Sequence, residues 1–593
     1  MQITYLDGKR FYRGLLAGGK RVIQNQAYLN KINVFPVADA DTGSNLALTM
    51  KAILESSRGV TSLKETLRSV ADAALGGARG NSGIIFAQYL HGLSRELPEK
   101  GALTVKHFAE SAQKAVAHLY GSLMNPVEGT MLTVIRDWAE KLAEQSQNTQ
   151  DFLHALNESL GAAKQSLQDT PRKLKVLADA GVVDAGASGF VNFLEGVMDY
   201  IHQGTLRGKE TDTTHIEVAD IAESHAGVPE KYRYCTEALL TGFSCSVNLI
   251  KGILGGYGDS LILAGGEEKL HLHIHTNEPD KVFEELFKLG EVSGAKVEDM
   301  LRQYQVSHDP VFPIGIVTDS ACDLPPEILD RYHILQIPFG ISFGTRSYLD
   351  KLTLTPESFY TLLKNDPAHP VSSQPSPALV KNTLDLACRS YQQVIAVHLS
   401  DKLSGIFQSC SQTAKEHGPQ VGVINSRQLS VTEGLVTLRV ARAVETGMSF
   451  AEIMEKAPEW SDNTTIYTDV NTLKYMVRGG RVKPLTGFIA ALLNLKPIVS
   501  LDKEGKALAY GKSFSRKSNM RKIVSMIRTE LKQRKVWEYA IVHADAEARA
   551  VQYAALLTAL TGKKPAWIMP LSPVVGVHNG HGAVGIGVSY ERS

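Results

Sequence analysis

The stretch 190–201, FVNFLEGVMDYI, decides the fold of the first third of the chain. Its apolar residues recur at i, i+3, i+4, i+7, i+8 and i+11, which places them on one side of a helix. They are Phe190, Phe193, Leu194, Val197, Met198 and Ile201. Such a stripe needs other helices to cover it, and the apolar spacing is mostly helical from Phe11 to Gln203. The sequence therefore predicts an all-helical first domain over residues 1–205.

The composition of the whole chain excludes several classes of protein. Its 593 residues contain 63 Lys+Arg and 62 Asp+Glu, so we expect no nucleic-acid partner and no basic membrane-binding face. Five cysteines in so long a chain argue against a disulfide framework and indicate a reducing compartment. No stretch has the pattern of a signal peptide or a membrane span. We therefore expect a cytoplasmic protein with no integral membrane segment.

The sequence pattern changes twice after the helical region. A polar, weakly periodic stretch predicts a linker over 206–229, and a small α/β middle domain is expected over 230–309. After Pro310, short β-branched stretches alternate with helical segments. These stretches are residues 314–318, 394–399, 421–424, 466–468 and 540–543. Strands separated by helical crossovers predict an α/β sheet with a ligand at the carboxyl ends of its strands, in a two-lobed domain over 311–593.

Two loops in the helical region carry residues suited to binding phosphate. Asp39 and Asp41 are separated by a single residue in a tight loop, and paired carboxylates suit Mg²⁺. The alternative is an Asp-rich turn that only caps a helix. Loop 76–83, GGARGNSG, would let backbone N–H groups approach phosphate oxygens. With Thr130 and Asp184, these loops predict a nucleotide pocket on a helical scaffold.

At these residues the first 200 positions resemble the ATP-binding domain of the DhaL-type dihydroxyacetone kinase and fatty acid kinase families. The matching stretches are NVFPVADADTGSN at 33–45, GARGNSG at 77–83, EGTMLT at 128–133 and GVVDAG at 181–186. The resemblance implies an eight-helix barrel in which Asp39 and Asp41 bind the Mg²⁺ that bridges ATP phosphates. Val34 stands where the sugar kinases have a third aspartate.

Further residues of these loops are predicted to contact ATP. They are Thr42, Gly43, Ser44, Asn45, Gly80, Asn81, Ser82, Gly83, Thr130 and Asp184. We also expect Arg79 to be a catalytic cation near the transferred phosphoryl group, the alternative being a surface arginine with no role.

A run of histidines marks the middle domain. In KLHLHIHTN, residues 269–277, strand alternation places His271, His273 and His275 on one face. Together with Cys235 they suit Zn²⁺, and the alternative is the polar, solvated face of a half-buried strand. The segment resembles the middle domain of fatty acid kinase. That resemblance implies zinc bound by Cys235, His273 and His275, and a homodimer.

The last domain carries several short polar turns in order. IGIVTDSACDLP at 314–325 reads as a buried strand that ends in small polar groups, although Asp319 or Ser320 could merely cap a helix. SSQPS at 372–376, LSG at 403–405, GGR at 479–481 and GVHNGHG at 576–582 follow. Together they resemble the DegV family, the fatty-acid-binding partners of fatty acid kinase. The resemblance implies an acyl tunnel, with the carboxylate held by Ser372, Ser404 and His578 and with Arg481 as the nearby cation.

These domains together predict an ATP-dependent kinase that phosphorylates a fatty acid bound in its own DegV-like domain. The product is an acyl phosphate for a downstream acyl-transfer enzyme. No general base is required, because a carboxylic acid is already ionised at neutral pH. Two alternatives stay open: a non-catalytic lipid-binding or regulatory protein, and, less favoured, a dihydroxyacetone-type kinase of small hydroxyketones.

Overall fold

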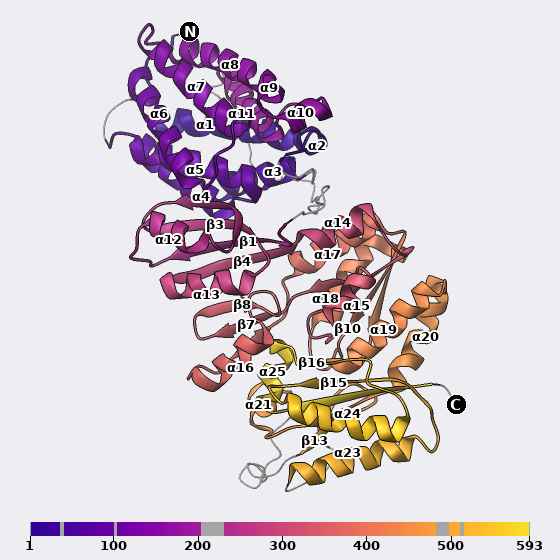
Figure 1. Cartoon of the computed structure of the whole chain (residues 1–593). Helices are drawn as coiled ribbons and strands as arrows, with labels where there is room; N and C mark the ends of the chain where they lie inside the picture. The colour runs from indigo at the N-terminus through magenta and orange to yellow at the C-terminus, as the bar shows by residue number, and fades with distance from the viewer. Residues whose placement is uncertain are drawn as a thin grey trace. The chain divides into compact units, whose positions relative to one another are not determined.

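The computed structural model describes residues 2–35, 41–99, 103–202, 231–481, 497–509 and 515–591 (Figure 1). The chain forms two compact units, Met1–Tyr304 and Gln305–Ser593. The first unit contains the helical domain and the middle domain. The linker predicted over 206–229 lies outside the described residues.

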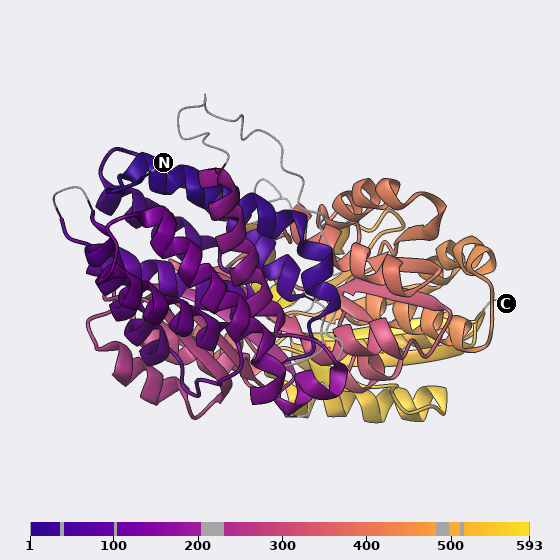
Figure 2. The ribbon, with the colours of Figure 1, turned by 90° about the horizontal axis from the view of Figure 1, so that it is seen from above.

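The helical domain is a closed ring of long helices, which form the indigo-to-purple group in Figure 2. Among its described residues these are α1 (Gly8–Gln24), α3 (Thr42–Ser56), α4 (Leu63–Gly77), α5 (Gly80–Glu96), α6 (Val105–Ser122), α7 (Met131–Ser146), α8 (Phe152–Gln168) and α11 (Ala185–His202). Each helix packs on the next one, and α11 packs on both α8 and α1. The expected eight-helix barrel is confirmed, with three short helices added in its connections: α2 (Gln26–Lys31), α9 (Thr170–Lys173) and α10 (Lys175–Ala180).

The stripe of α11 forms part of the barrel core. Phe190 and Leu194 are buried there, and Phe193 packs against the same cluster. The ring of Phe190 meets Trp138 and Tyr89 edge to face, with centroids 5.9 and 6.3 Å away. Since successive long helices of the ring run in opposite directions, α3, α5, α7 and α11 all begin at the same end of the barrel.

The middle domain is a four-stranded antiparallel sheet in the order β2-β3-β1-β4. Its strands are β1 (Tyr234–Thr241), β2 (Gly258–Gly265), β3 (Lys269–Thr276) and β4 (Glu291–Asp299). Helices α12 (Val247–Leu254) and α13 (Pro279–Leu289) cover the apolar face, and α14 (Met300–His308) follows β4. On the opposite face Ile262 and Ala264 belong to the core of the barrel. His271 and His273 are buried on that face, so the interpretation of a solvated histidine face is wrong.

The second unit contains two main sheets rather than one. The first is parallel, in the order β11-β10-β5-β6, and the second is mixed, in the order β14-β13-β12-β17-β15-β16. All five predicted strands exist. Three of them, β5 (Ile314–Asp319), β10 (Gln393–His398) and β11 (Val421–Asn425), lie in the parallel sheet. The other two, β12 (Thr464–Asp469) and β15 (Val536–His543), lie in the mixed sheet, where both pair antiparallel with β17 (Val584–Tyr590).

The remaining elements complete these lobes. The strands are β6 (Leu335–Ile337), β13 (Ile498–Leu501), β14 (Ala507–Ala509), β16 (Ile568–Pro570) and the three-stranded sheet of β7 (Gly340–Phe343), β8 (Arg346–Leu349) and β9 (Val371–Ser373). The helices are α15 (Pro326–Arg331), α16 (Pro356–Asn365), α17 (Pro377–Ser390), α18 (Ile406–Ala414), the 3₁₀ helix η2 (Lys415–Gln420), α19 (Val431–Glu445), α20 (Phe450–Asp462), α21 (Lys474–Arg478), α23 (Arg516–Glu530), α24 (Glu547–Thr561) and α25 (Pro573–Asn579).

Candidate functional site

The two ends of the barrel differ in how their helices are capped. Helices α1, α4, α6 and α8 each start with an N-cap residue whose side chain accepts a hydrogen bond from a first-turn N–H. These N-cap residues are Asp7, Ser62, Thr104 and Asp151, in that order. At the opposite end, the N-cap side chains of α3, α5 and α7 make no such hydrogen bond within the described residues. First-turn N–H groups have no intrahelical partner and carry partial positive charge. This end of the barrel is therefore suited to an anion such as phosphate.

The loops at that end are in close contact. A Cβ atom on Gly186 of α11 would lie 2.9 Å from Ser82 Oγ of α5 and 3.5 Å from Met131 Cβ of α7. A Cβ atom on Gly80 would lie 2.2 Å from Asn45 Nδ2 of α3. The structure thus brings described residues of the four predicted loops into one cluster.

Asp41 presents a buried carboxylate in this cluster, whereas Asp39 lies outside the described residues. Asn45 Nδ2 donates to Asp41 Oδ2 at 2.8 Å. Asn45 Oδ1 is buried and has no hydrogen-bond partner among the described residues. An oriented carboxylate beside an unpartnered amide oxygen is a donor set that fits a hard cation such as Mg²⁺.

Several predicted ATP contacts also hold the loops in place. Ser44 Oγ accepts hydrogen bonds from Gln26 Nε2 at 3.1 Å and from Asn30 Nδ2 at 2.9 Å. Thr130 Oγ1 donates to Val127 O, and Thr42 Oγ1 donates to Asn33 Oδ1. A Cβ atom on Gly43 would lie 2.2 Å from Gln26 O, so only glycine fits between α2 and α3. Their contact with ATP stays a prediction.

The glycine-rich loop leads directly into α5, whose first turn contains Asn81 and Ser82. Gly80 has φ +56°, in the left-handed region that favours glycine. Arg79 N donates to Thr49 Oγ1 at 3.3 Å, and a Cβ atom on Gly83 would lie 2.4 Å from the same oxygen. The guanidinium of Arg79 donates to Ala78 O at 2.9 Å. Its catalytic role stays a prediction.

Asp184 closes the cluster at the start of α11. Its Oδ1 accepts from the backbone N–H of Ala187 at 2.7 Å, and its own N–H donates to Thr170 Oγ1. Burial raises the pKa of Asp184 to about 6, although hydrogen bonds from the Ala187 and Met131 N–H groups act to lower that pKa. The carboxylate therefore bridges the first turns of α11 and α7.

The middle domain contains one group of side chains that could hold a metal ion, among the residues that the structure describes. The ligand atoms of Cys235, His273 and His275 all lie within 4.8 Å of one another. Cys235 Sγ is 3.8 Å from His273 Nδ1. In the antiparallel register, Cys235 pairs with His275 and Glu237 with His273. A thiolate with two imidazoles fits Zn²⁺.

Two further side chains on the same face reach the barrel. His271 Nδ1 lies 2.8 Å from Leu75 O. Glu237, for which the sequence predicts no role, accepts the Gly80 N–H at Oε1 over 3.1 Å. Glu237 stands two residues after Cys235 on a strand, and alternate strand residues share a face. This spacing could have predicted that Glu237 lies on the face of the metal group.

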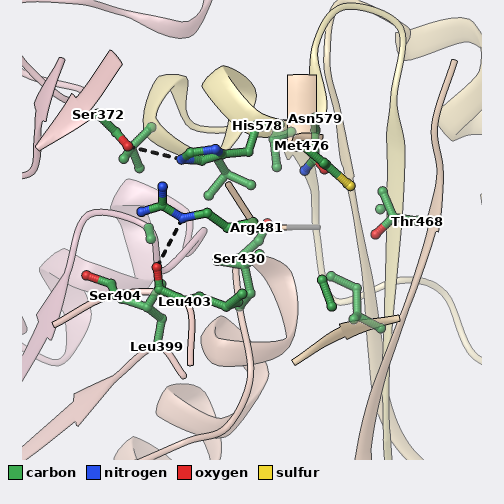
Figure 3. A pocket seen from close by; sticks show the side chains of 18 of the residues that line it. Ser372, Leu399, Leu403, Ser404, Ser430, Thr468, Met476, Arg481, His578 and Asn579 are labelled. Carbon is green, nitrogen blue, oxygen red and sulfur yellow. Dashed lines mark hydrogen bonds between the residues drawn. The ribbon is translucent and has the colours of Figure 1, made fainter. Parts of the chain in front are cut away.

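The second unit contains a partly open pocket of about 250 Å³, lined by residues of both main sheets. All four predicted head-group residues line it: Ser372, Ser404, Arg481 and His578 (Figure 3). Ser372 Oγ lies 3.0 Å from His578 Nε2, and Arg481 Nε donates to Leu403 O at 3.3 Å. The rest of the lining is mainly apolar and includes Leu399, Leu429, Ile466, Val499, Val542 and Val575. A ligand with a polar head and an apolar body fits this lining.

His578 is neutral in this cavity. Burial, with the nearby Arg481 and His369, lowers its pKa to about 4. A Cβ atom on Gly479 would lie 2.1 Å from His578 Nδ1, so glycine at this position makes room for the imidazole. The neutral ring has one N–H to donate, and its Nε2 is the atom that faces Ser372.

These features define a multidomain protein with a helical barrel, a small sheet domain that carries a metal-capable group of side chains, and a two-lobed α/β domain with a lined pocket. Comparison with family models gives the particular domains. Residues 36–199 match the DAK2 domain, 231–307 match the fatty acid kinase A-like middle domain, and 313–591 match the DegV family, described as uncharacterised proteins. The chain thus combines a DAK2 domain, a fatty acid kinase A-like middle domain and a DegV domain.

Individual relatives match parts of the chain. Uncharacterized proteins of Staphylococcus aureus strains bovine RF122 / ET3-1 and USA300 are each 32% identical over 313 residues, 51% of this chain. The chain spans 57% of the length of those relatives. Solved structures of a fatty-acid-binding DegV family protein from Thermus thermophilus and of DegV from Bacillus subtilis are each 27% identical, with a TM-score of 0.44. Each match covers 47% of this chain and all of the other. Within the described residues, every helix is too short or too polar to cross a membrane.

Proposed function

We propose that this chain is an ATP- and Mg²⁺-dependent fatty acid kinase. Its barrel binds ATP, and the acceptor is the carboxylate of a fatty acid held in its own DegV domain. The observation that carries the proposal is the end of the barrel where α3, α5 and α7 begin without a side-chain N-cap, beside the buried carboxylate of Asp41. The match of the middle domain to fatty acid kinase supports the same activity.

The cavity of the DegV domain supports a fatty acid as acceptor. Its apolar walls suit an acyl chain, while Ser372, Ser404 and Arg481 provide hydrogen-bond donors for a carboxylate. His578, whose Nε2 lies 3.0 Å from Ser372 Oγ, fixes the direction of that hydroxyl.

The chemistry needs alignment and charge stabilisation rather than a base. The ionised carboxylate attacks the γ-phosphorus, the bond to the bridging oxygen of ADP breaks, and an acyl phosphate forms. Asp41 and Asp39 would hold Mg²⁺, which neutralises phosphate charge when bound. First-turn N–H groups of α5 and α3 other than those of Gly80 and Ser44, which bond to Glu237 and Asn30, orient the phosphates, and Arg79 adds positive charge. The acyl phosphate then serves a downstream acyl-transfer enzyme.

Zinc at Cys235, His273 and His275 is proposed as a structural ion of the middle domain. The three donors come from two paired strands, so one ion would join β1 to β3 at this face. A homodimer stays a prediction.

The test is acyl phosphate formation by the purified chain. With Mg²⁺, ATP and oleate, we expect ADP release that depends on oleate, and an acyl hydroxamate when hydroxylamine is added. Oleate binding without ADP release would leave only a lipid-binding protein. Phosphorylation of dihydroxyacetone in place of oleate would identify a hydroxyketone kinase. Mass spectrometry of lipid that copurifies with the chain checks the acceptor independently.

A further inference from the structure

Glu237 connects the candidate metal group to the glycine-rich loop. Its side chain is 2% exposed. Oε1 accepts the backbone N–H of Gly80 at 3.1 Å and lies 3.2 Å from His273 Nδ1. His273 Nε2 is buried and has no hydrogen-bond partner within the described part of the chain. Nδ1 of His273 thus lies beside both the carboxylate and Cys235 Sγ, which is 3.8 Å away, and Nε2 has no partner, so one nitrogen can face Glu237 while the other binds a metal ion.

The hydrogen bond to Gly80 falls at a sensitive point of the loop. Gly80 is the first residue of α5, and its N–H has no partner within the helix. Its backbone, with φ of +56°, sets the direction in which the chain enters the helix. The next residues, Asn81 and Ser82, are the predicted phosphate contacts. A shift of Gly80 would therefore move Asn81 and Ser82 directly.

The sheet contacts the barrel at two more points. His271 Nδ1 lies 2.8 Å from Leu75 O, near the end of α4, just before the loop. Gln88 Oε1 of α5 accepts the N–H of Gly265 at 2.6 Å. The sheet thus contacts both helices that flank residues 78–79, and Glu237 is the contact that also reaches the metal group.

We propose that Glu237 is a positioning residue that couples metal binding at Cys235, His273 and His275 to the geometry of the nucleotide loop. A metal-bound imidazole commonly donates its second N–H to a carboxylate, which fixes both groups. Glu237 fixed in this way holds Gly80, and through it the first turn of α5. The inference rests on the proposed function, because it assigns the nucleotide to this loop.

The test measures nucleotide binding rather than turnover. Glu237→Ala should bind Mg·ADP roughly tenfold more weakly, because a buried hydrogen bond to a charged group is lost. Glu237→Gln keeps a carbonyl oxygen for the Gly80 N–H and should recover most of the affinity. Glu291→Ala, at an exposed position of β4, is the matched control and should bind as the wild type does. Zinc content is measured in every variant.

Zinc removal separates coupling from a simple structural role. Chelation should weaken Mg·ADP binding by the wild type by a similar factor and have little further effect on Glu237→Ala, because both changes act through one contact. Equal losses on chelation in both proteins, or unchanged affinity in Glu237→Ala, would overturn the proposal. If Glu237→Ala does not fold, chelation of the wild type decides: Mg·ADP affinity that is unchanged after zinc removal would overturn the proposal. A wild type that binds no Mg·ADP would overturn the proposed function itself, which is a distinct result.

Discussion

Ser372 Oγ and His578 Nε2 lie 3.0 Å apart at the cavity of the second unit, although 206 residues separate them in the chain. Ser372 belongs to β9 and His578 to α25. The pair therefore joins the small three-stranded sheet to the helix before the last strand. Because the imidazole is neutral, it carries no charge that a ligand anion would have to balance. The contact between His578 and the Ser372 hydroxyl can therefore form without a bound ligand.

Removal of the Ser372 hydroxyl should weaken fatty acid binding. Ser372→Ala deletes one donor to the carboxylate and leaves His578 without this partner, so we expect about 5- to 30-fold weaker binding of oleate. Displacement of a fluorescent fatty acid measures the change. Ser390→Ala, on α17 and outside the cavity lining, is the control. Equal affinity of the two variants for oleate would exclude Ser372 from the head-group site.

The low pKa of His578 predicts an acid-sensitive second unit. Its pKa of about 4 in the fold lies below its ordinary value of 6.5, so the unfolded chain takes up the proton first as pH falls. The free energy of unfolding is therefore unaffected above about pH 6.5 and decreases between 6.5 and 4, by about 3 kcal/mol at pH 4. Denaturant unfolding of wild type and His578→Gln at pH 7 and pH 4.5 measures this contribution. A wild type and a variant with the same pH dependence would contradict it.

The sequence predicts the elements of this protein better than their long-range pairing. The spacing from Phe190 to Ile201 follows from local periodicity, and α11 packs as that spacing predicts. Two lobes are expected for the last domain, but the pairing of β12 with β17 joins strands more than 100 residues apart, so the order of strands in the second sheet was not predictable from strand patterns. The same holds for the site. Cys235, His273 and His275 meet as expected, and strand alternation could have placed Glu237 on their face, but nothing in the sequence indicates that Glu237 bonds to Gly80, 157 residues away.

Asp41 should be essential for turnover but not for acceptor binding. Asp41→Asn removes a charged oxygen donor for Mg²⁺ and keeps the size of the side chain, so we expect at least about a hundredfold slower formation of acyl hydroxamate. Oleate affinity should stay unchanged, because the cavity lies in the other unit. Asp72→Asn, at an exposed position of α4, is the control and should retain full turnover. Unchanged turnover in Asp41→Asn would remove Asp41 from the metal site.

Zinc binding in the middle domain should depend on the paired strands β1 and β3. The double variant Cys235→Ser, His273→Ala removes the thiolate and one imidazole, which leaves His275 as the single ligand of the group. One imidazole cannot retain Zn²⁺ against dilution, so elemental analysis should show about one zinc per chain in the wild type and close to none in the variant. Cys245→Ser, at a free cysteine outside the group, is the control and should keep its zinc. Zinc in the double variant at the wild-type level would place the ion elsewhere in the chain. If the ion joins β1 to β3, its loss should also lower the melting temperature of the first unit and leave that of the second unit unchanged.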